Sequence, residues 1–243
     1  MNLAAGIIFY QDCKSLKRCL DSLPACHVNH IFCIDGRFPD FKGETDFSTD
    51  GSIELVRSYP HTEYVPHPGP EEAKRNKYLE LAEAQGFDWI IVIDCDEYIS
   101  YVNWEMLKMN LDLCPKNLEV YMTRFKAPDP AFEIGLQRLI RVTGKLEYFG
   151  VDNLRDKVSG KLAEVGGTLD GLMLSTDDTL RDANWLEQMC NYEIEMAKSN
   201  LDFCVDIAVK SGMERDRALW QFHTRINLLM RESAKLKTIP SKT

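Results

Sequence analysis

The chain has 243 residues, of which 44% are hydrophobic and 28% are charged, which suits one sizeable α/β domain with a small appendage. The formal net charge of −9 and the pI near 5.1 argue against a general nucleic-acid binder. No apolar stretch approaches the length that spans a bilayer. The first ten residues lack the basic region of a signal peptide and predict a core strand instead.

Eight cysteines are present, and their surroundings favour free thiols. Cys33 and Cys95 lie in or beside predicted buried strands, where a thiol packs as a small hydrophobic group. We therefore expect a reduced, cytoplasmic protein. The alternative is a zinc site in residues 26–33, Cys26-His27-x-x-His30-x-x-Cys33, but the end of this cluster enters a predicted strand, which disfavours shared ligand geometry.

Strands and helices alternate in the first hundred residues. Apolar, β-branched runs predict strands, and leucine-rich runs at helical spacing predict helices that end at Pro24, Pro60 and Gly86. The predicted strands are 4–10, 30–34, 62–65 and 89–93, and the predicted helices are 14–23, 52–59 and 71–85. Such alternation predicts a mostly parallel sheet with right-handed crossovers. The polar loop 36–50 is long for a compact domain, which is typical of a functional loop.

After residue 97, predicted strands and helices no longer alternate regularly. A helix is predicted at 104–113, strands are predicted at 118–125, 137–142, 145–149 and 172–175, and turns are predicted at Gly160, Gly166, Gly167 and Gly171. Helices are predicted at 184–199, 201–210 and 215–235. We therefore divide the chain into an α/β domain at 1–182, with halves 1–100 and 101–182, and a helical C-terminal extension at 183–243 that packs on it.

A cluster of acidic residues follows the most apolar predicted strand. Trp89 to Ile93 are apolar without alternation, as in a strand buried on both faces, and Asp94-Cys95-Asp96-Glu97 come next. Residues two apart in an extended chain point the same way, so Asp94 and Asp96 can converge. A hard divalent cation that carries phosphate oxygens would relieve their repulsion. The alternative is a solvated acidic turn.

Four motifs in order resemble the nucleotide-sugar half of a family-2 glycosyltransferase with the GT-A fold. They are Leu16-x-x-Cys19-Leu20-x-Ser22-Leu23, then Asp35 with Ser48-Thr49-Asp50-Gly51-Ser52-x-Glu54, then Ala73-Lys74-Arg75-Asn76, and finally Asp94-Cys95-Asp96. The resemblance implies a three-layer α/β sandwich with a mostly parallel central sheet. It also implies a UDP- or GDP-linked sugar donor and a Mn²⁺ or Mg²⁺ ion.

The resemblance also implies roles for individual residues on the donor side. Asp96 would hold the metal, and Asp94 would stand near it or near the ribose. Asp35 resembles the residue that hydrogen-bonds the base, with an ordinary Asp-Gly turn as the alternative. Tyr10 and Gln11 would contact the nucleoside, and Arg75 would face the diphosphate or the sugar.

The likeness thins in the acceptor half. Arg138 to Arg141 and the run from Tyr148 resemble that half, but Asp152-Asn153 stands where many relatives have a His-Glu pair. Transfer with inversion needs a carboxylate that removes the acceptor proton, and Asp152 is the first candidate, before Asp129 and Asp156. The acceptor classes that the family offers are glycans, lipids, proteins and modified nucleobases.

The remaining charged residues receive simpler interpretations. Glu97 is expected to start a turn rather than to support the metal, and Lys74 and Lys77 are expected on a solvated helix face. Asn76 is expected to bond backbone near the strand that ends at Asp94. The basic helix at 215–235 is interpreted as packing on the domain, with contact to an anionic membrane or another anionic partner as the alternative.

Two rival functions remain open. A nucleotidyltransferase on a similar fold would normally have a glycine-rich loop after the first strand, and residues 10–14 contain no glycine. A non-catalytic nucleotide-sugar-binding or regulatory module would explain Asp152-Asn153 in place of the usual pair.

Overall fold

The computed structural model describes residues 1–39, 41, 45–126, 133–149, 153–176 and 215. Asp152, Asp129 and the predicted C-terminal helices lie outside these residues, so the predictions made for them stay predictions. In the described part of the chain, no helix is both long and apolar enough to cross a membrane.

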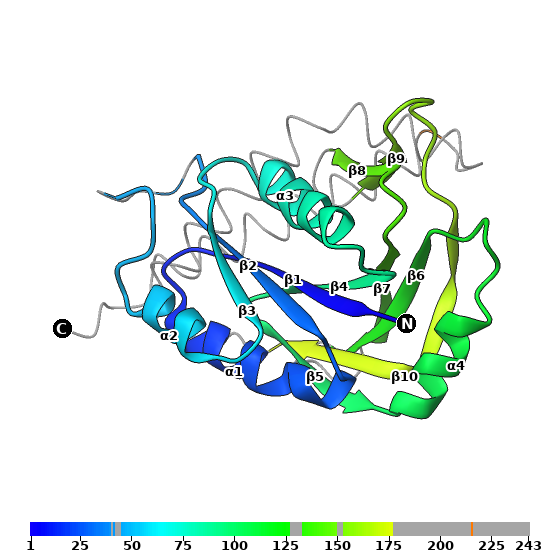
Figure 1. Ribbon diagram of the computed structural model, residues 1–243, viewed down its shortest axis with the longest axis horizontal. Helices are drawn as coiled ribbons and strands as arrows, with labels where there is room; N and C mark the ends of the chain where they lie inside the picture. Colours follow the sequence, from blue (N-terminus) through cyan, green and yellow to red (C-terminus); the bar gives the residue numbers. More distant parts are fainter. Residues whose placement is uncertain (40, 42–44, 127–132, 150–152, 177–214, 216–243) are drawn as a thin grey trace. The chain divides into compact units, whose positions relative to one another are not determined.

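The first half of the chain forms four parallel strands connected by helices. The strands are β1 (Leu3–Phe9), β2 (His30–Asp35), β3 (Thr62–Pro66) and β4 (Trp89–Asp94), in the order β3-β2-β1-β4. The helices are α1 (Cys13–Ser22), which a 3₁₀ turn at Leu23–Cys26 extends, α2 (Ser52–Ser58) and α3 (Glu71–Ala84). Helix α3 covers one face of these strands, and α1 and α2 lie on the other (Figure 1). The predicted alternation is confirmed, and no end of these strands and helices is shifted by more than one residue.

Burial explains why the sequence folds in this way. All seven residues of β1 and the first five of β4 are buried, so both strands lie inside a three-layer structure, as parallel strands covered by helices do. The buried face of α1 contributes Leu16, Cys19 and Leu20 to the core beneath the sheet. The apolar runs that predicted these strands are therefore the centre of the core.

The second half continues the same sheet with mixed strand directions. Its elements are β5 (Glu97–Val102), α4 (Trp104–Asp112), β6 (Val120–Lys126), β7 (Glu133–Arg141), β8 (Leu146–Phe149), β9 (Asn153–Asp156) and β10 (Val165–Thr176). Strand β7 runs antiparallel to β4 and β6, β10 runs parallel to β6, and β5 closes the edge. Strands β8 and β9 form a separate hairpin beside α3 (Figure 1).

Three predictions for this half need correction. Strand β5 begins at Glu97, where a turn was expected, and β9 was not foreseen. Gly166, Gly167 and Gly171 lie inside β10 rather than in turns. The pairing of β10 with β6 shifts between Leu169 and Met173, and Gly171 there has a φ of +101°, a value that glycine adopts without strain. The glycines therefore mark irregularities within a strand.

Candidate active site

The residues predicted to bind the donor come from neighbouring strand ends. In the parallel register, Phe9 pairs with Asp35 and Ile8 pairs with Asp94, so the two carboxylates flank the end of β1. Tyr10 and Gln11 follow β1 directly. The carboxyl ends of parallel strands are where open α/β sheets bind ligands.

Asp94 lies between two arginines. Its Oδ1 accepts a hydrogen bond from Arg75 Nη2 at 2.8 Å, and its Oδ2 accepts one from Arg138 Nη2 at 2.9 Å. The side chains of Arg75 and Arg138 are only 4% and 8% exposed. Both oxygens of Asp94 are therefore engaged by cations from two different elements, α3 and β7. Sequence reasoning found Arg75 but gave Arg138 no role.

Glu97 completes this buried group, which corrects its interpretation as the start of a turn. Glu97 is 4% exposed and accepts hydrogen bonds from Arg138 Nε at 3.1 Å and Nη2 at 2.7 Å. The Asp94 N–H donates to Glu97 Oε2 at 3.1 Å. Burial raises the pKa of Glu97 to about 7, against the pull of the Arg138 guanidinium. On the other side, Arg75 pairs with Glu71 at 2.6 Å.

Asp96 has different surroundings from Asp94. Its Oδ2 accepts a hydrogen bond from the Thr176 hydroxyl at 3.2 Å, and its backbone carbonyl accepts one from Arg18 Nη2 at 3.3 Å. Asp96 is half-buried. The described partner of the Asp96 carboxylate is thus a neutral hydroxyl, whereas two guanidinium groups compensate the charge of Asp94.

The carboxylates of the candidate site suit a divalent ion that binds together with the phosphate groups of a ligand. Among the described residues, no cluster of three or more His, Cys, Asp or Glu side chains is arranged to hold a metal ion. Mg²⁺ usually binds through one or two carboxylates together with substrate phosphates and water, rather than in an all-protein cage. Asp96 fits that role, while the oxygens of Asp94 already accept from arginines.

Asp35 is buried and holds the long loop rather than facing open space. Its carboxylate accepts hydrogen bonds from Ser48 N at 3.1 Å, Ser48 Oγ at 2.7 Å and Tyr64 Oη at 3.0 Å. Burial raises the pKa of Asp35, and these donors oppose the increase. Its predicted contact with a base would require Asp35 to exchange one of these partners.

Tyr10 and Gln11 bind the same loop. The Tyr10 hydroxyl donates to the Thr45 carbonyl at 2.8 Å. The side-chain amide of Gln11 donates to Thr49 Oγ1 at 3.1 Å and accepts from Thr49 N at 3.2 Å. The three predicted nucleoside contacts, Tyr10, Gln11 and Asp35, therefore lie together and fix loop 45–50 over the strand ends.

Lys74 is buried in α3, which corrects its placement on a solvated face. It is fully buried, its Nζ donates to the Gly36 carbonyl, and it lies 3.4 Å from the centroid of the Phe38 ring. Burial lowers the pKa of Lys74 to about 7. Lys77 is confirmed as solvent-facing, with a 35% exposed side chain that pairs with Glu80.

Asn76 bonds backbone, as predicted, but in a different strand. Its side chain contacts Tyr148 in β8 rather than the strand that ends at Asp94.

The residues of the zinc alternative do not converge on one point. The His27 ring stacks on Trp104, with centroids 4.8 Å apart, and His30 packs against Phe32 and pairs with Glu63. Cys26 and Cys33 are buried in the core.

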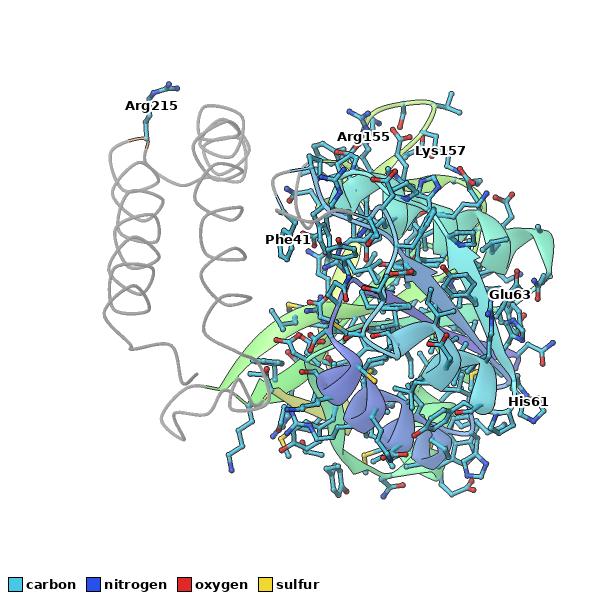
Figure 2. All side chains as sticks on the ribbon, turned by 90° about the vertical axis from the view of Figure 1, so that its left-hand side faces the viewer. Phe41, His61, Glu63, Arg155, Lys157 and Arg215 are labelled. Atoms are coloured by element: carbon cyan, nitrogen blue, oxygen red, sulfur yellow. The ribbon has the colours of Figure 1, made fainter. Side chains whose placement is uncertain are left out.

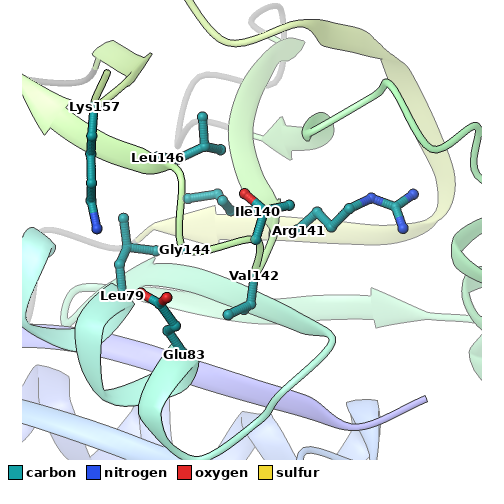
Figure 3. A pocket seen from close by; sticks show the side chains of 9 residues that line it. Leu79, Glu83, Ile140, Arg141, Val142, Gly144, Leu146 and Lys157 are labelled. Atoms are coloured by element: carbon teal, nitrogen blue, oxygen red, sulfur yellow. The ribbon is translucent and has the colours of Figure 1, made fainter. Parts of the chain in front are cut away.

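A shallow pocket lies away from the carboxylates. It is lined by the end of α3 and the β7–β8 turn (Figure 3), with Leu79, Glu83, Ile140, Arg141, Val142, Thr143, Gly144, Leu146 and Lys157. Arg141 pairs with Trp89 at the start of β4, whereas Asp94 ends that strand. The pocket is therefore at the opposite end of β4 from the candidate site.

Known proteins resemble the chain in structure but not detectably in sequence. No family model and no curated protein matches it. The structure of S. aureus TarS 1–349 matches with a TM-score of 0.50 and 15% identity, covering 93% of this chain and 71% of that one. The same protein in complex with UDP-GlcNAc matches with a TM-score of 0.51 and 13% identity, covering 93% and 72%. The chain spans 43% of the longer TarS structure.

A third similar structure is the mannosyltransferase PcManGT from Pyrobaculum calidifontis in complex with GDP-Man and Mn²⁺. Its TM-score is 0.48 and its identity is 12%, over 97% of this chain and 73% of that one. The likeness to TarS shows that the chain has the α/β fold of GT-A transferases, with a mixed, mostly parallel central sheet, as the motifs predicted.

Proposed function

We propose that this chain is a glycosyltransferase that moves a sugar from a nucleoside-diphosphate sugar to an acceptor hydroxyl. The observation that carries the proposal is the gathering of Asp35, Asp94 and Asp96 at the carboxyl ends of β2 and β4, the two strands that flank β1, in a fold shared with GT-A transferases. Loop 45–50, which Asp35 holds, lies over the same strand ends and would cover the nucleoside.

On the donor side, Asp96 would hold a Mn²⁺ or Mg²⁺ ion together with the diphosphate. When bound, the ion supplies charge neutralisation for the leaving nucleoside diphosphate. Asp94 would support the site indirectly or through the ribose, because Arg75 and Arg138 fix both of its oxygens. The two arginines thereby set the direction in which the turn at Cys95 and Asp96 leaves β4.

On the acceptor side, transfer would proceed with inversion, and a carboxylate would take the proton of the acceptor hydroxyl. Asp156 suits this role poorly. Its carboxylate accepts from Val158 N at 3.0 Å and Ser159 N at 2.6 Å, and these bonds lower its pKa. A carboxylate held in this way is a weaker base, so Asp152, which lies outside the described residues, remains the proposed base.

The proposal is tested by a thermal-shift screen of UDP and GDP with Mn²⁺, Mg²⁺ or a chelator. A ligand that binds the folded state at a hundred times its Kd adds about 2.7 kcal/mol of stability. We expect one nucleotide to raise the Tm only when a metal is present. Lys77→Ala is the matched control, because Lys77 makes only a surface pair, and it should behave as the wild type.

Two outcomes would contradict the proposal. A screen in which no nucleoside diphosphate shifts the Tm with either metal would remove the nucleotide-sugar site. Metal-dependent binding without hydrolysis or transfer of UDP-GlcNAc, GDP-mannose or related donors would favour the non-catalytic module instead.

A further inference from the structure

Three consecutive residues of α3 contact three different parts of the candidate site. Lys74 donates to the Gly36 carbonyl at the start of the loop after β2. Arg75 donates to Asp94 at the end of β4. Asn76 binds the backbone of Tyr148 in β8. Successive helical residues point about 100° apart, so one turn of α3 reaches the nucleoside side, the diphosphate side and the hairpin of the acceptor half.

The contact of Asn76 with β8 has the form of a strand pairing. Asn76 Nδ2 donates to the Tyr148 carbonyl at 3.0 Å, and Asn76 Oδ1 accepts from the Tyr148 N–H at 2.7 Å. A side-chain amide offers the same donor and acceptor as a peptide group. Because β8 pairs with β9 through its other edge, Asn76 satisfies the edge that a further strand would otherwise occupy.

Tyr148 is held by its ring as well as by its backbone. The Tyr78 ring meets it edge-on, with centroids 6.2 Å apart, and the Arg75 guanidinium lies 5.5 Å from its centroid. Tyr78 in turn packs on β1 so closely that a Cβ at Gly6 would lie 2.6 Å from Tyr78 Cγ. The contacts therefore run without a gap from the central strand of the donor half to β8.

The two ends of the hairpin differ in sequence. At one end, residues 150–152 connect Phe149 to Asn153 and include the proposed base, Asp152. At the other end, Leu146 pairs with Asp156, and Figure 2 shows Arg155 and Lys157, the sequence neighbours of Asp156, close to each other. Asn76 contacts β8 at Tyr148, next to Phe149, the last residue of the strand.

We propose that Asn76 is a positioning residue that sets the acceptor hairpin against the donor site. Its catalytic meaning rests on the proposed glycosyltransferase function, but its structural part stands without it. Removing the Asn76 amide should loosen the hairpin while the strands that carry Asp35 and Asp94 keep their stability. Donor hydrolysis, in which water replaces the acceptor, should then survive better than transfer.

Hydrogen–deuterium exchange of the full chain tests the structural part. In Asn76→Ala, the Tyr148 amide and the β8–β9 peptides should exchange on the order of tenfold faster, because hydrogen bonds to the backbone are lost. Peptides from β1 and β4 should not change. Asn76→Asp keeps an acceptor for the Tyr148 N–H and should preserve most of its protection. Lys77→Ala, one residue along the same helix, should match the wild type.

The same variants separate this inference from the proposed function. Asn76→Ala should bind UDP or GDP with Mn²⁺ within about threefold of the wild type, and its ratio of transfer to donor hydrolysis should fall at least tenfold. Unchanged Tyr148 exchange in Asn76→Ala, or equally faster exchange throughout β1 and β4, would overturn the inference. Absence of nucleotide binding in the wild type would instead contradict the proposed function, and the exchange data would still decide whether Asn76 holds the hairpin.

Discussion

The sheet is built differently in its two halves. From β3 to β4, neighbouring strands run parallel, helices connect them, and β1 is buried along its whole length. From β7 to β5, antiparallel and parallel pairs mix, and the pairings of β10 contain irregularities. The first half supplies Asp35 and Asp94, and the second half supplies Glu97 from β5 and Arg138 from β7, which binds both Asp94 and Glu97. The site therefore depends on the seam between β4 and β7, by which we mean the ion pairs of Arg138 in β7 with Asp94 and Glu97.

The largest effect should come from breaking that seam. Arg138→Met removes the guanidinium that pairs with the buried Glu97 carboxylate, while Asp94 keeps its pair with Arg75, so we expect a loss of about 3–5 kcal/mol in the free energy of unfolding. Urea denaturation measures it. Arg124→Met is the matched control, because the pair of Arg124 with Asp170 is more than half exposed on both sides and should contribute about 0–1 kcal/mol. Equal losses in the two variants would show that the seam carries no special stability.

A second test compares how tightly the two halves are packed. In Gly6→Ala, the new methyl group would lie 2.6 Å from Tyr78 Cγ, and such overpacking should cost about 1–3 kcal/mol. Among the described residues, apart from the two chain neighbours of Gly167, none places a heavy atom within 4 Å of a Cβ added at this position in β10, so Gly167→Ala should change stability by less than about 0.5 kcal/mol. Thermal or urea unfolding of both variants checks the difference, and a Gly6→Ala protein as stable as Gly167→Ala would contradict the packing of Tyr78 on β1.

A smaller effect, specific to the first half, should appear in the pH dependence. The pKa of Lys74 is about 7 in the folded chain and near 10.4 in an unfolded one, so the unfolded state binds the extra proton between these values. Stability should therefore rise with pH above 7, by up to about 1.4 kcal/mol per pH unit. Between pH 7 and pH 8.5, the free energy of unfolding of the wild type should rise by about 1–2 kcal/mol relative to that of Lys74→Met. A stability difference that stays constant over this range would show that Lys74 titrates normally.

The first half was largely predictable because local patterns determine it. Short β-branched apolar runs such as Trp89 to Ile93 favour buried strands, and a proline or glycine follows the end of each helix. Beyond Asp94 local patterns were insufficient. Glu97 looked like part of an acidic turn because its partner, Arg138, lies 41 residues further along the chain. The glycines of β10 suggested turns, since a bulged strand and a turn both use glycine.

The candidate site was predictable in its residue types but not in its contacts. The motifs located Asp35, Arg75, Asp94 and Asp96. The structure places these residues together at the carboxyl ends of β2 and β4. Sequence patterns could not show that Asp35 is buried under Ser48 and Tyr64 or that Asp94 lies between two arginines, because those partners come from other elements. A charged residue within an apolar strand, such as Arg138 in β7, was the available signal that a buried partner exists.

The central claim is that Asp96 supports a metal-dependent nucleotide-sugar reaction, while Asp94 belongs to a buried ion-pair group. The most direct measurement is turnover of UDP- and GDP-linked sugars with Mn²⁺, by hydrolysis or transfer, in the wild type and Asp96→Ala. We predict that the wild type turns over one donor and that Asp96→Ala falls at least a hundredfold, about 2.7 kcal/mol in transition-state stabilisation, with an unchanged unfolding midpoint. Turnover that survives Asp96→Ala undiminished would contradict the account.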